Sequence, residues 1–401
     1  MIKKRGIDIG FLLAVLFLIV FGVVMVSSVS VYESNQLTQS FVNKGIDGWE
    51  TPVNDFYLWR HVFRVMISLP LLFLASRIPY HFWRKMALPL FGISIFLLVL
   101  VLIPQFSNDY GSAKSWLNLP LLPRFQPSEV AKLALIFYLA IWMDKKVQAI
   151  KSFQEGFLPF VVLLSVFVLL IGLQPDFGAI LVIACISASI FFVAGGNILH
   201  IIGGGMSSFL LAWPIVLSHE YIKKRLLLFL DPSLDPQGAG YQIKQALMTI
   251  GSGEWWGVGF GKSIQKFGYL PEVQGDTIFA VAAEELGFIR IALLLFVFLF
   301  LAWRGYLIAM NAPDRFSTLL ATGCTSWIFF QAIINMGVTM AVLPLTGITL
   351  PFISYGGSSL FTMSIAAGIL LNISMYAQKE MSFRVQWRGL WRPHRSIARY
   401  R

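Results

Sequence analysis

Residues 270–281 read LPEVQGDTIFAV, and here the sequence passes from mixed composition into a long apolar run. The mixed segment begins at His219 and follows several other apolar runs, and the new run lasts to about residue 303. Asp276 therefore stands at the expected start of a membrane helix, below a loop large enough to build a site. A carboxylate there is costly unless it is solvated, paired or used in function. We therefore expect a functional site around Asp276.

The composition indicates a polytopic membrane protein. Of the 401 residues, 57% are hydrophobic and 13% are charged, whereas a soluble domain has fewer apolar and more charged residues. The first apolar run, residues 9–29, is too long for a cleavable signal peptide. Cys185 and Cys324 lie in apolar runs, so neither a disulfide framework nor a metal site is expected from them.

The apolar runs predict an all-α fold with ten transmembrane helices, since each span needs about 20 apolar residues. The large loop, about residues 218–276, lies between the seventh and eighth spans. The ten candidate spans are centred on residues 9–29, 57–76, 87–104, 127–143, 156–173, 179–196, 199–217, 277–303, 316–343 and 359–377.

The basic residues predict the orientation. An even number of spans puts both termini on one side, and that side carries most of the unmatched Lys and Arg, which makes it cytoplasmic. The net charge of +11 is thus explained by topology and not by nucleic-acid binding. We expect a transmembrane domain over residues 1–378 and a basic cytoplasmic tail over residues 379–401. The tail would attract anionic membrane lipids or dock a partner.

Two interpretations of Asp276 follow from its position. The positive end of a helix favours an ionised carboxylate, and Asp is also among the best N-cap residues. Glu272, four residues earlier, is either a second functional carboxylate or a solvated one. Glu284 and Glu285 would lie about 12 Å deeper at 1.5 Å per residue, and we expect them to pair with Lys or Arg on another span.

The outer loop contains a predicted short helix and a glycine-rich segment. Apolar residues recur at i, i+3, i+4 and i+7, which predicts a helix along the membrane interface with Lys244 facing water. These residues are Ile243, Ala246, Leu247 and Ile250. Glycines then alternate near Lys262 and Lys266, which suits either a phosphate-binding backbone nest or a glycine-rich turn. The glycines are Gly257, Gly259 and Gly261.

A charged pair lies at the start of the fourth span, in the sequence FQPSEVAK of residues 125–132. Pro127 suits the first turn of a helix, and Glu129 and Lys132 are three residues apart, so they share one face. Lys132 would lie about 8 Å below the helix start. It either forms an ion pair that positions the helix or faces an anionic substrate.

Two elbows lie on the outer face. Residues 174–178, QPDFG, predict a tight turn in which Asp176 is a turn residue. Residues 343–359 combine prolines, glycines and hydroxyls, including Ser354 and Ser358, within apolar surroundings. Irregular backbone at membrane depth survives only where protein or a cavity covers it, so we expect the second elbow to line a cavity.

Together these motifs resemble the SEDS family (shape, elongation, division and sporulation), the FtsW/RodA group. The resemblance covers most of the chain in the family's order, and it implies ten transmembrane helices with a large loop between the seventh and eighth. The matching stretches are residues 126–132, 174–178, 231–241, 250–253, 269–276, 284–287 and 350–359.

The resemblance implies a peptidoglycan glycosyltransferase in the bacterial cytoplasmic (inner) membrane. Its substrate would be lipid II, with undecaprenyl pyrophosphate as the leaving group, and its partners a class B penicillin-binding protein (a transpeptidase) and other divisome proteins. Residues 261–269 look more like the division branch, FtsW, and residues 345–347 lean toward the elongation branch, RodA. We expect the division branch. The alternatives are an elongation polymerase, a lipid II flippase or a scaffold that recruits an enzyme.

In this family the essential acid occupies the position of Asp276. We expect Asp276 to be the general base for the acceptor hydroxyl, with nearby cations stabilising the departing diphosphate. A divalent cation, Mg²⁺ or Mn²⁺, could share that work, but no ligand spacing demands one and no metal ligands are assigned. The expected substrate-binding residues are Lys132, Glu129, Arg60, Glu272, Ser354, Ser358, Lys223 and Arg225.

Overall fold

The computed structural model describes residues 6–46, 48, 50–110, 113–118, 124–207 and 220–376. The end of the predicted seventh span, the first residues of the outer loop and the basic tail at 379–401 lie outside the described residues.

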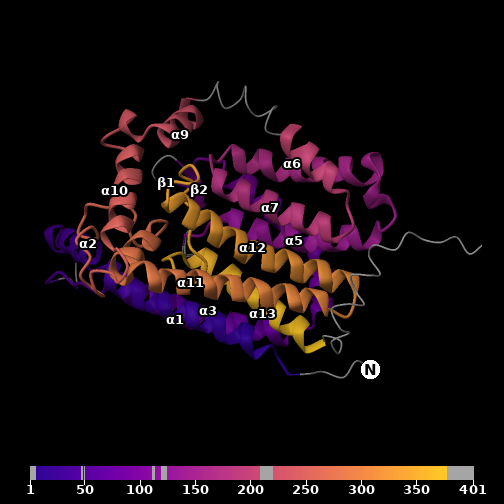
Figure 1. Cartoon of the computed structure of the whole chain (residues 1–401), viewed down its shortest axis with the longest axis horizontal. Coiled ribbons are helices and arrows are strands. Elements are labelled where there is room, and N and C mark those ends of the chain that lie inside the picture. The colour runs from indigo at the N-terminus through magenta and orange to yellow at the C-terminus, as the bar shows by residue number, and fades with distance from the viewer. Residues whose placement is uncertain are drawn as a thin grey trace, which may run out of the picture.

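The regular secondary structure of the described residues is almost entirely helical, which confirms the all-α fold (Figure 1). The predicted outer-loop helix is present, with Ile243 and Ala246 buried and Lys244 exposed as expected, although Leu247 is exposed as well. One two-stranded hairpin was not predicted. The elements are α1 (Ile9–Val29), α2 (Val31–Asn43), α3 (Phe56–Arg77), α4 (Tyr80–Leu100), β1 (Ser107–Tyr110), β2 (Ala113–Leu117), α5 (Pro127–Lys145), η1 (Ala149–Lys151), η2 (Phe153–Phe157), α6 (Leu158–Gly172), α7 (Phe177–Val193), the helix Ile198–Ser207, α9 (Glu220–Leu230), η3 (Pro232–Leu234), α10 (Ala239–Ser252), α11 (Ile278–Met310), α12 (Arg315–Thr339) and α13 (Gly357–Tyr376).

Seven helices of the described residues are long and apolar enough to cross a membrane. They correspond to the first, second, third, fifth, eighth, ninth and tenth predicted spans. The fourth corresponds to α5, which is 19 residues long and contains four charged residues. The sixth corresponds to α7, which has 17 residues. The chain is a multi-pass membrane protein, and the count of ten spans stays a prediction.

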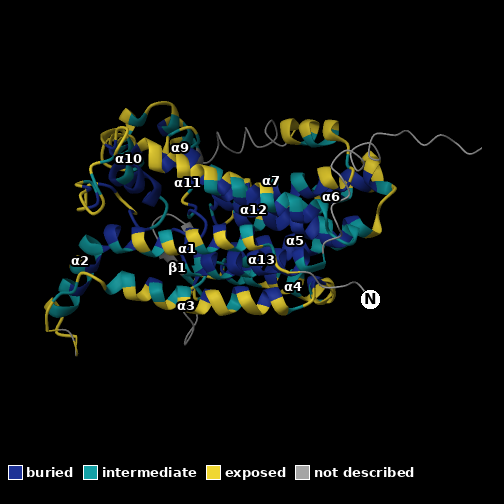
Figure 2. Cartoon of the chain, turned by 60° about the horizontal axis from the view of Figure 1, so that its bottom comes forward, coloured by how far each residue is buried: buried dark blue, intermediate teal, exposed yellow. Residues whose placement is uncertain are grey.

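The helices α12 and α13 form the centre of the bundle (Figure 2). Small residues let their neighbours approach closely, as is usual between membrane helices. A Cβ on Gly368 of α13 would lie 2.3 Å from the Leu72 carbonyl of α3, so only glycine fits there. The surrounding helices α1, α3, α4 and α11 expose apolar side chains along their outer faces, as a lipid-facing surface requires.

Two contacts between α1 and α11 mark the height of the membrane. Arg304 pairs with Asp8 at 2.7 Å beside the start of α1, and Ser28 donates to Glu285 at 2.7 Å at the other end of α1. The unbroken helix α1 rises about 30 Å between Asp8 and Ser28, close to the thickness of the hydrocarbon core. Glu285 therefore lies level with the outer end of α1.

This frame corrects the predicted depth of Glu284 and Glu285. They lie level with the outer end of α1, and their partners come from the outer loop and not from basic residues on another span. Lys266 of the loop donates to Glu285 at 2.8 Å, and Ser263 donates to Glu284. The sequence expectation was wrong because α11 is interrupted at Gly287, so Glu284 and Glu285 belong to a short outer half-helix that the loop covers.

A break at Gly287, with φ 79° and ψ 171°, divides α11 into an outer half-helix, residues 278–286, and a membrane-spanning part, residues 288–310. The outer loop supplies the hydrogen bonds that the break leaves open. Val258 N–H donates to the Glu284 carbonyl at 2.9 Å, and Phe288 N–H donates to the Glu254 carbonyl at 2.8 Å. Backbone groups near the hydrocarbon must be satisfied within the protein, so the loop and the break depend on each other.

Substitution of Gly287 by Ala tests this break. The backbone conformation is essentially restricted to glycine and costs another residue about 1–3 kcal/mol, and a Cβ would lie 2.2 Å from the Gly257 nitrogen. We expect Gly287→Ala to lower the melting temperature in detergent by several degrees. Gly251→Ala in α10, where a Cβ meets open space, should leave it unchanged. Equal melting temperatures for the two variants would contradict the assigned break.

Candidate active site

The Asp276 carboxylate lies half-buried just before the outer half-helix of α11. The N-cap residue of this helix is Thr277, and no side chain caps the first turn, so the N-cap interpretation of Asp276 is wrong. The Thr277 hydroxyl instead donates to the Pro271 carbonyl at 2.7 Å, which holds the preceding turn. Asp276 Oδ1 is buried without a hydrogen-bond partner among the described residues, so it can accept a proton or a hydrogen bond.

Two acids of the outer loop and one acid of α2 share this neighbourhood. Burial, reinforced by the charge of Glu272, raises the pKa of Asp276 to about 7, while Arg225 and a hydrogen bond from Gln242 oppose the shift. Burial also raises the pKa of Glu272. Burial and the Glu272 charge together raise the pKa of Glu33, on α2, to about 7. Neighbouring carboxylates cannot all ionise easily, so near neutral pH this group retains protons.

The sequence analysis did not assign Glu33 to the site. Gln274, two residues before Asp276, donates to the Glu33 carboxylate. The backbone carbonyl of Gln274 also accepts a hydrogen bond from Tyr355 N–H at 2.8 Å. Gln274 thus joins α2 and the second elbow to the loop that bears Asp276.

The backbone of Asp276 is fixed by α12. The side-chain amide of Asn335 donates to the Asp276 carbonyl at 2.9 Å and to the Ile348 carbonyl at 2.7 Å, and Thr339 donates to the Asp276 carbonyl at 3.4 Å. Both acceptors of Asn335 are carbonyls, so its NH₂ group must face them. Asn335 therefore holds the Asp276 loop against the second elbow.

The same face of α12 continues inward. Gln331 Oε1 accepts hydrogen bonds from Lys132 at 2.8 Å and from Trp327 at 2.8 Å. Gln331 Nε2 donates to the Thr349 carbonyl at 3.1 Å. Four residues at four-residue spacing thus form one polar stripe, which we call the α12 ladder. Its members are Trp327, Gln331, Asn335 and Thr339. Asp276 and Lys132 are attached to it about 6 Å apart along the helix axis.

Lys132 and Glu129 form a buried ion pair at 2.7 Å, and only 1% of Lys132 is exposed. The ammonium also lies 5.2 Å from the centre of the Trp327 ring. This geometry is the first of the two alternatives, an ion pair that positions α5. Glu129 Oε2 is buried without a partner among the described residues. A contact of either residue with substrate stays a prediction.

The two serines predicted to bind substrate each accept a hydrogen bond from a backbone N–H group. Ser354 accepts a hydrogen bond from Leu350 N–H at 2.8 Å within the second elbow, and Ser358 accepts one from Gln126 N–H at 3.1 Å. Asp176 of the first elbow caps α7 through Ala179 N–H, as a turn residue should, and also accepts a hydrogen bond from Gln126. Both elbows are therefore tied to the start of α5.

The predicted cations of α9 lie at different places. Arg225 donates to the Leu345 carbonyl at 2.8 Å and its charge acts on Asp276, so it belongs to the site. Lys223 is half-buried on the same helix. Lys224 pairs with Asp235 at 2.8 Å.

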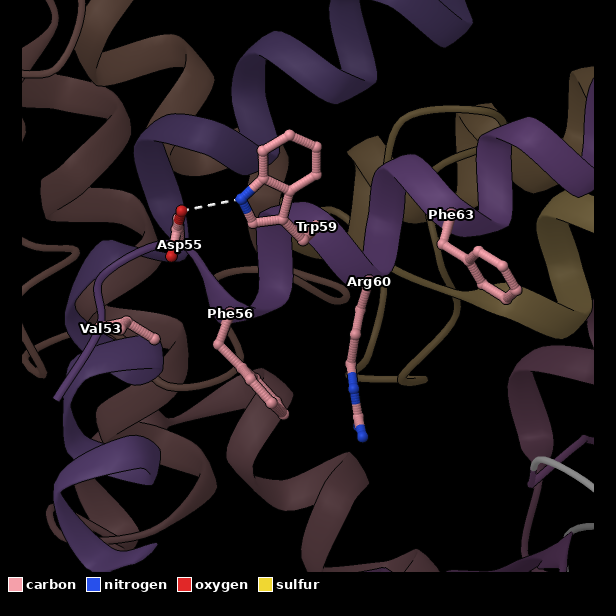
Figure 3. A pocket seen from close by; sticks show the side chains of 6 residues that line it. All are labelled: Val53, Asp55, Phe56, Trp59, Arg60 and Phe63. Carbon is pink, nitrogen blue, oxygen red and sulfur yellow. Dashed lines mark hydrogen bonds between the residues drawn. The ribbon is translucent and has the colours of Figure 1, made fainter. Parts of the chain in front are cut away.

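The contacts described for Arg60 are with residues of α3 and do not involve Asp276. It is exposed on α3 and lines a shallow groove of about 420 Å³ with Trp59, whose indole donates to Asp55 (Figure 3). Arg64, one turn along, is half-buried over the Tyr355 ring at 4.0 Å. Arg64 was not predicted, although its four-residue spacing from Arg60 placed both on one helix face.

The glycine-rich segment is a turn and not a phosphate nest. The N–H groups of Val258 and Gly259 donate to carbonyls of α11, and Lys266 is buried in its pair with Glu285. Among the described residues, no group of three or more His, Cys, Asp and Glu side chains could hold a metal ion.

Comparisons with known proteins agree over nearly the whole chain. A family model described as cell cycle protein, for the FtsW, RodA and SpoVE group, matches residues 10–379. Stage V sporulation protein E of Bacillus subtilis is 39% identical over 377 residues, which cover 94% of this chain and 99% of that protein. A protein of Trichlorobacter lovleyi named "Probable peptidoglycan glycosyltransferase FtsW" is 39% identical over 367 residues, which cover 92% of this chain and 93% of that protein.

Two solved structures share the fold. A chain from a peptidoglycan synthase complex, studied for the coordination of polymerization and crosslinking, has a TM-score of 0.74 and 28% identity, covering 92% of this chain and 97% of that one. The rod shape determining protein RodA of Thermus thermophilus has a TM-score of 0.64 and 25% identity, and the match covers 92% of this chain and 96% of that one.

Replacement of Lys132 by Met tests the buried pair. Loss of one partner leaves the Glu129 charge buried, and we expect a loss of about 3–5 kcal/mol of stability. The double variant Lys132→Met with Glu129→Gln should recover most of it, because no unpaired charge remains. Melting temperatures in detergent measure both effects, with the exposed Lys244→Met as control. A single variant as stable as wild type would show that the pair is not buried.

Proposed function

The chain belongs to the FtsW, RodA and SpoVE family of cell cycle proteins, and from this membership we propose that Asp276 is the base of a peptidoglycan glycosyltransferase. In this proposal the enzyme polymerises lipid II into glycan strands, and the support is that relatives are named as a peptidoglycan glycosyltransferase and as part of a peptidoglycan synthase complex. One observation carries the role of Asp276: its buried Oδ1 has no partner among the described residues, while its backbone is held by α12.

The reaction requires one proton acceptor and stabilisation of one leaving group. The acceptor sugar 4-hydroxyl attacks the anomeric carbon of the donor sugar, a C–O bond forms, and the bond from that carbon to the diphosphate oxygen breaks. Asp276 Oδ1 takes the hydroxyl proton, and undecaprenyl pyrophosphate leaves with the electron pair. A base whose pKa is close to the working pH suits this transfer, and the pKa of Asp276 near 7 meets that condition.

Positive charge must compensate the departing diphosphate. Arg225 is placed best, since its charge already acts on Asp276, and Lys223 lies on the same helix. Arg64 approaches from α3 over Tyr355. Lys132 would contribute from one turn below, through its link to Gln331, while Arg60 would meet the substrate at the outer rim of α3. Glu129, Glu272, Ser354 and Ser358 would act through the segments that they position.

A divalent cation, Mg²⁺ or Mn²⁺, would supply further compensating charge when bound with the diphosphate. The described acids do not form a cage for it, so no ligands are assigned and the residue roles above do not depend on it.

The site faces outward in our proposal. Basic residues lie at the end of the bundle opposite Asp276, as Arg304 beside Asp8 and Arg84 beside Asp144 show. By the positive-inside rule that end is cytoplasmic, with both termini there and the protein in the bacterial inner membrane. The outer loop, about residues 218–276, then reaches lipid II on the extracytoplasmic face, and residues 379–401 form the cytoplasmic tail.

The proposed partner is a class B penicillin-binding protein that crosslinks the new strands within the divisome. Its support is the likeness to a chain of a peptidoglycan synthase complex and to proteins named FtsW. A sporulation protein of equal identity and RodA are relatives too, so we propose septal synthesis as the role and sporulation or elongation as alternatives.

Substitution of Asp276 by Asn tests the base directly. Purified Asp276→Asn should bind lipid II and make no glycan by gel electrophoresis of labelled product. Since the folded-state pKa is raised, the ionised carboxylate destabilises the fold above pH 7, so the variant should melt at or above the wild-type temperature at pH 8. The exposed outer acid Glu50, changed to Gln, is the control. Normal polymer from Asp276→Asn would remove this residue as the base, and an inactive wild type that moves lipid II across vesicles would favour the flippase.

The pH dependence tests the coupling of Asp276 to Glu272. The base must be ionised, so polymerisation should rise with pH through about 7, where the pKa of Asp276 lies. Glu272→Gln removes a negative charge that raises this pKa, and the acidic limb of the rate profile should move to lower pH. An unchanged or upward-shifted limb would contradict the coupling.

A further inference from the structure

One segment of the outer loop exposes large apolar side chains at its surface. We call residues 254–269 the interfacial loop. In it, 63% of Trp255, 69% of Trp256 and 67% of Ile264 are exposed, and so is Phe260. Apolar patches of this kind on an otherwise folded surface mark an interaction site.

The interfacial loop is attached to α11 on the side that faces lipid. Ile289 N–H donates to the Trp255 carbonyl at 3.3 Å, and the Trp255 ring meets the edge of the Phe288 ring at 5.3 Å. Arg290 donates to the Trp256 carbonyl at 2.8 Å. From this attachment an exposed apolar stripe continues along α11 through Leu293, Phe296 and Trp303.

The height of the attachment corresponds to the outer boundary of the bilayer. Phe288 lies sixteen residues before Arg304, which marks the inner end of α1 through Asp8, so the two are about 24 Å apart along α11. A hydrocarbon core of about 30 Å places Trp255 and Trp256 near its outer edge. Tryptophans gather at this depth because the ring is apolar and the indole N–H is polar.

We propose that the interfacial loop inserts into the outer leaflet at the boundary between headgroups and acyl chains, with a phospholipid surface as its partner. The continuity with the exposed face of α11 supplies the apolar part of this surface. Arg290 contacts the Trp256 backbone, and both Arg290 and Lys262 of the interfacial loop are exposed. The surface therefore carries positive charge that attracts lipid phosphates, and anionic lipid strengthens the contact.

The anchor has a consequence for the candidate site, which rests on the proposed function. The interfacial loop bears the outer half-helix through the hydrogen bonds of Val258 and Gly259 to α11 carbonyls and through Lys266 to Glu285. Asp276 lies directly before this half-helix, and its backbone is held by Asn335 of α12. The contact of the tryptophans with lipid therefore acts on the outer half-helix that begins just after Asp276, and through it on the candidate site.

Depth-dependent quenching tests the insertion without using activity. In the full chain with Cys185 and Cys324 changed to Ala, a single cysteine replaces Trp256 and carries an environment-sensitive dye in nanodiscs of phosphatidylcholine and phosphatidylglycerol. Lipids with a nitroxide near the headgroup should quench it several-fold more than they quench the same dye on Ser233→Cys, an exposed residue of η3. Removal of phosphatidylglycerol should weaken this quenching.

Three outcomes would overturn the insertion: a dye at position 256 as unquenched as at 233, an emission typical of water, or protection that arises only when a partner protein is added. If the cysteine variants fail to fold, quenching of intrinsic fluorescence by brominated lipid replaces them. Trp255→Phe with Trp256→Phe should then lose a large share of the quenchable signal, and no loss would reject the proposal. Since neither readout involves glycan synthesis, failure of the proposed function would leave this test intact.

Discussion

The α12 ladder joins the parts of the molecule that must meet at Asp276. In the bilayer core a polar side chain has no water to bind, so each donor and acceptor on α12 must find its partner within the protein. Gln331 and Asn335 meet this requirement by bonding to α5, to the second elbow and to the Asp276 loop. Among the buried atoms without a partner in the described residues, Asp276 Oδ1, Asn335 Oδ1 and Glu129 Oε2 lie on or beside this ladder. These open acceptors offer a place where a donor from a substrate can bind.

The break at Gly287 gives the site its position relative to the membrane. A straight helix of this length would either tilt or carry Asp276 far from the surface, whereas the break lets the loop pair with both halves. The buried pair of Lys266 and Glu285 then closes the outer half-helix onto the end of α1 through Ser28. Removal of either charge would leave the other buried and unpaired, so the pair fixes this arrangement in addition to stabilising it. The segment that bears Asp276 is therefore held between this half-helix and the outer end of α12.

Much of the fold was readable from hydropathy, because a span of about 20 apolar residues has one stable form in a bilayer. The first span was predicted at its observed bounds, Ile9–Val29, and Asp276 was found because a lone acid at the start of an apolar run is unusual. Contacts between distant segments could not be predicted from the sequence. Glu33 of α2 and Asn335 of α12 look like ordinary polar residues until folding brings them to the Asp276 loop. The depth of Glu285 was misjudged because one glycine breaks α11 and its partner, Lys266, lies in the loop.

Everything proposed for the chemistry depends on a carboxyl group at Asp276 that is poised between its two protonation states near neutral pH. Infrared difference spectra of the protein in nanodiscs, wild type minus Asp276→Asn, report that protonation directly across a pH titration. The account predicts that the protonated carboxyl band of Asp276 disappears with a midpoint near pH 7. A carboxylate that is already fully ionised at about pH 5, close to the behaviour of a free aspartate, would contradict it.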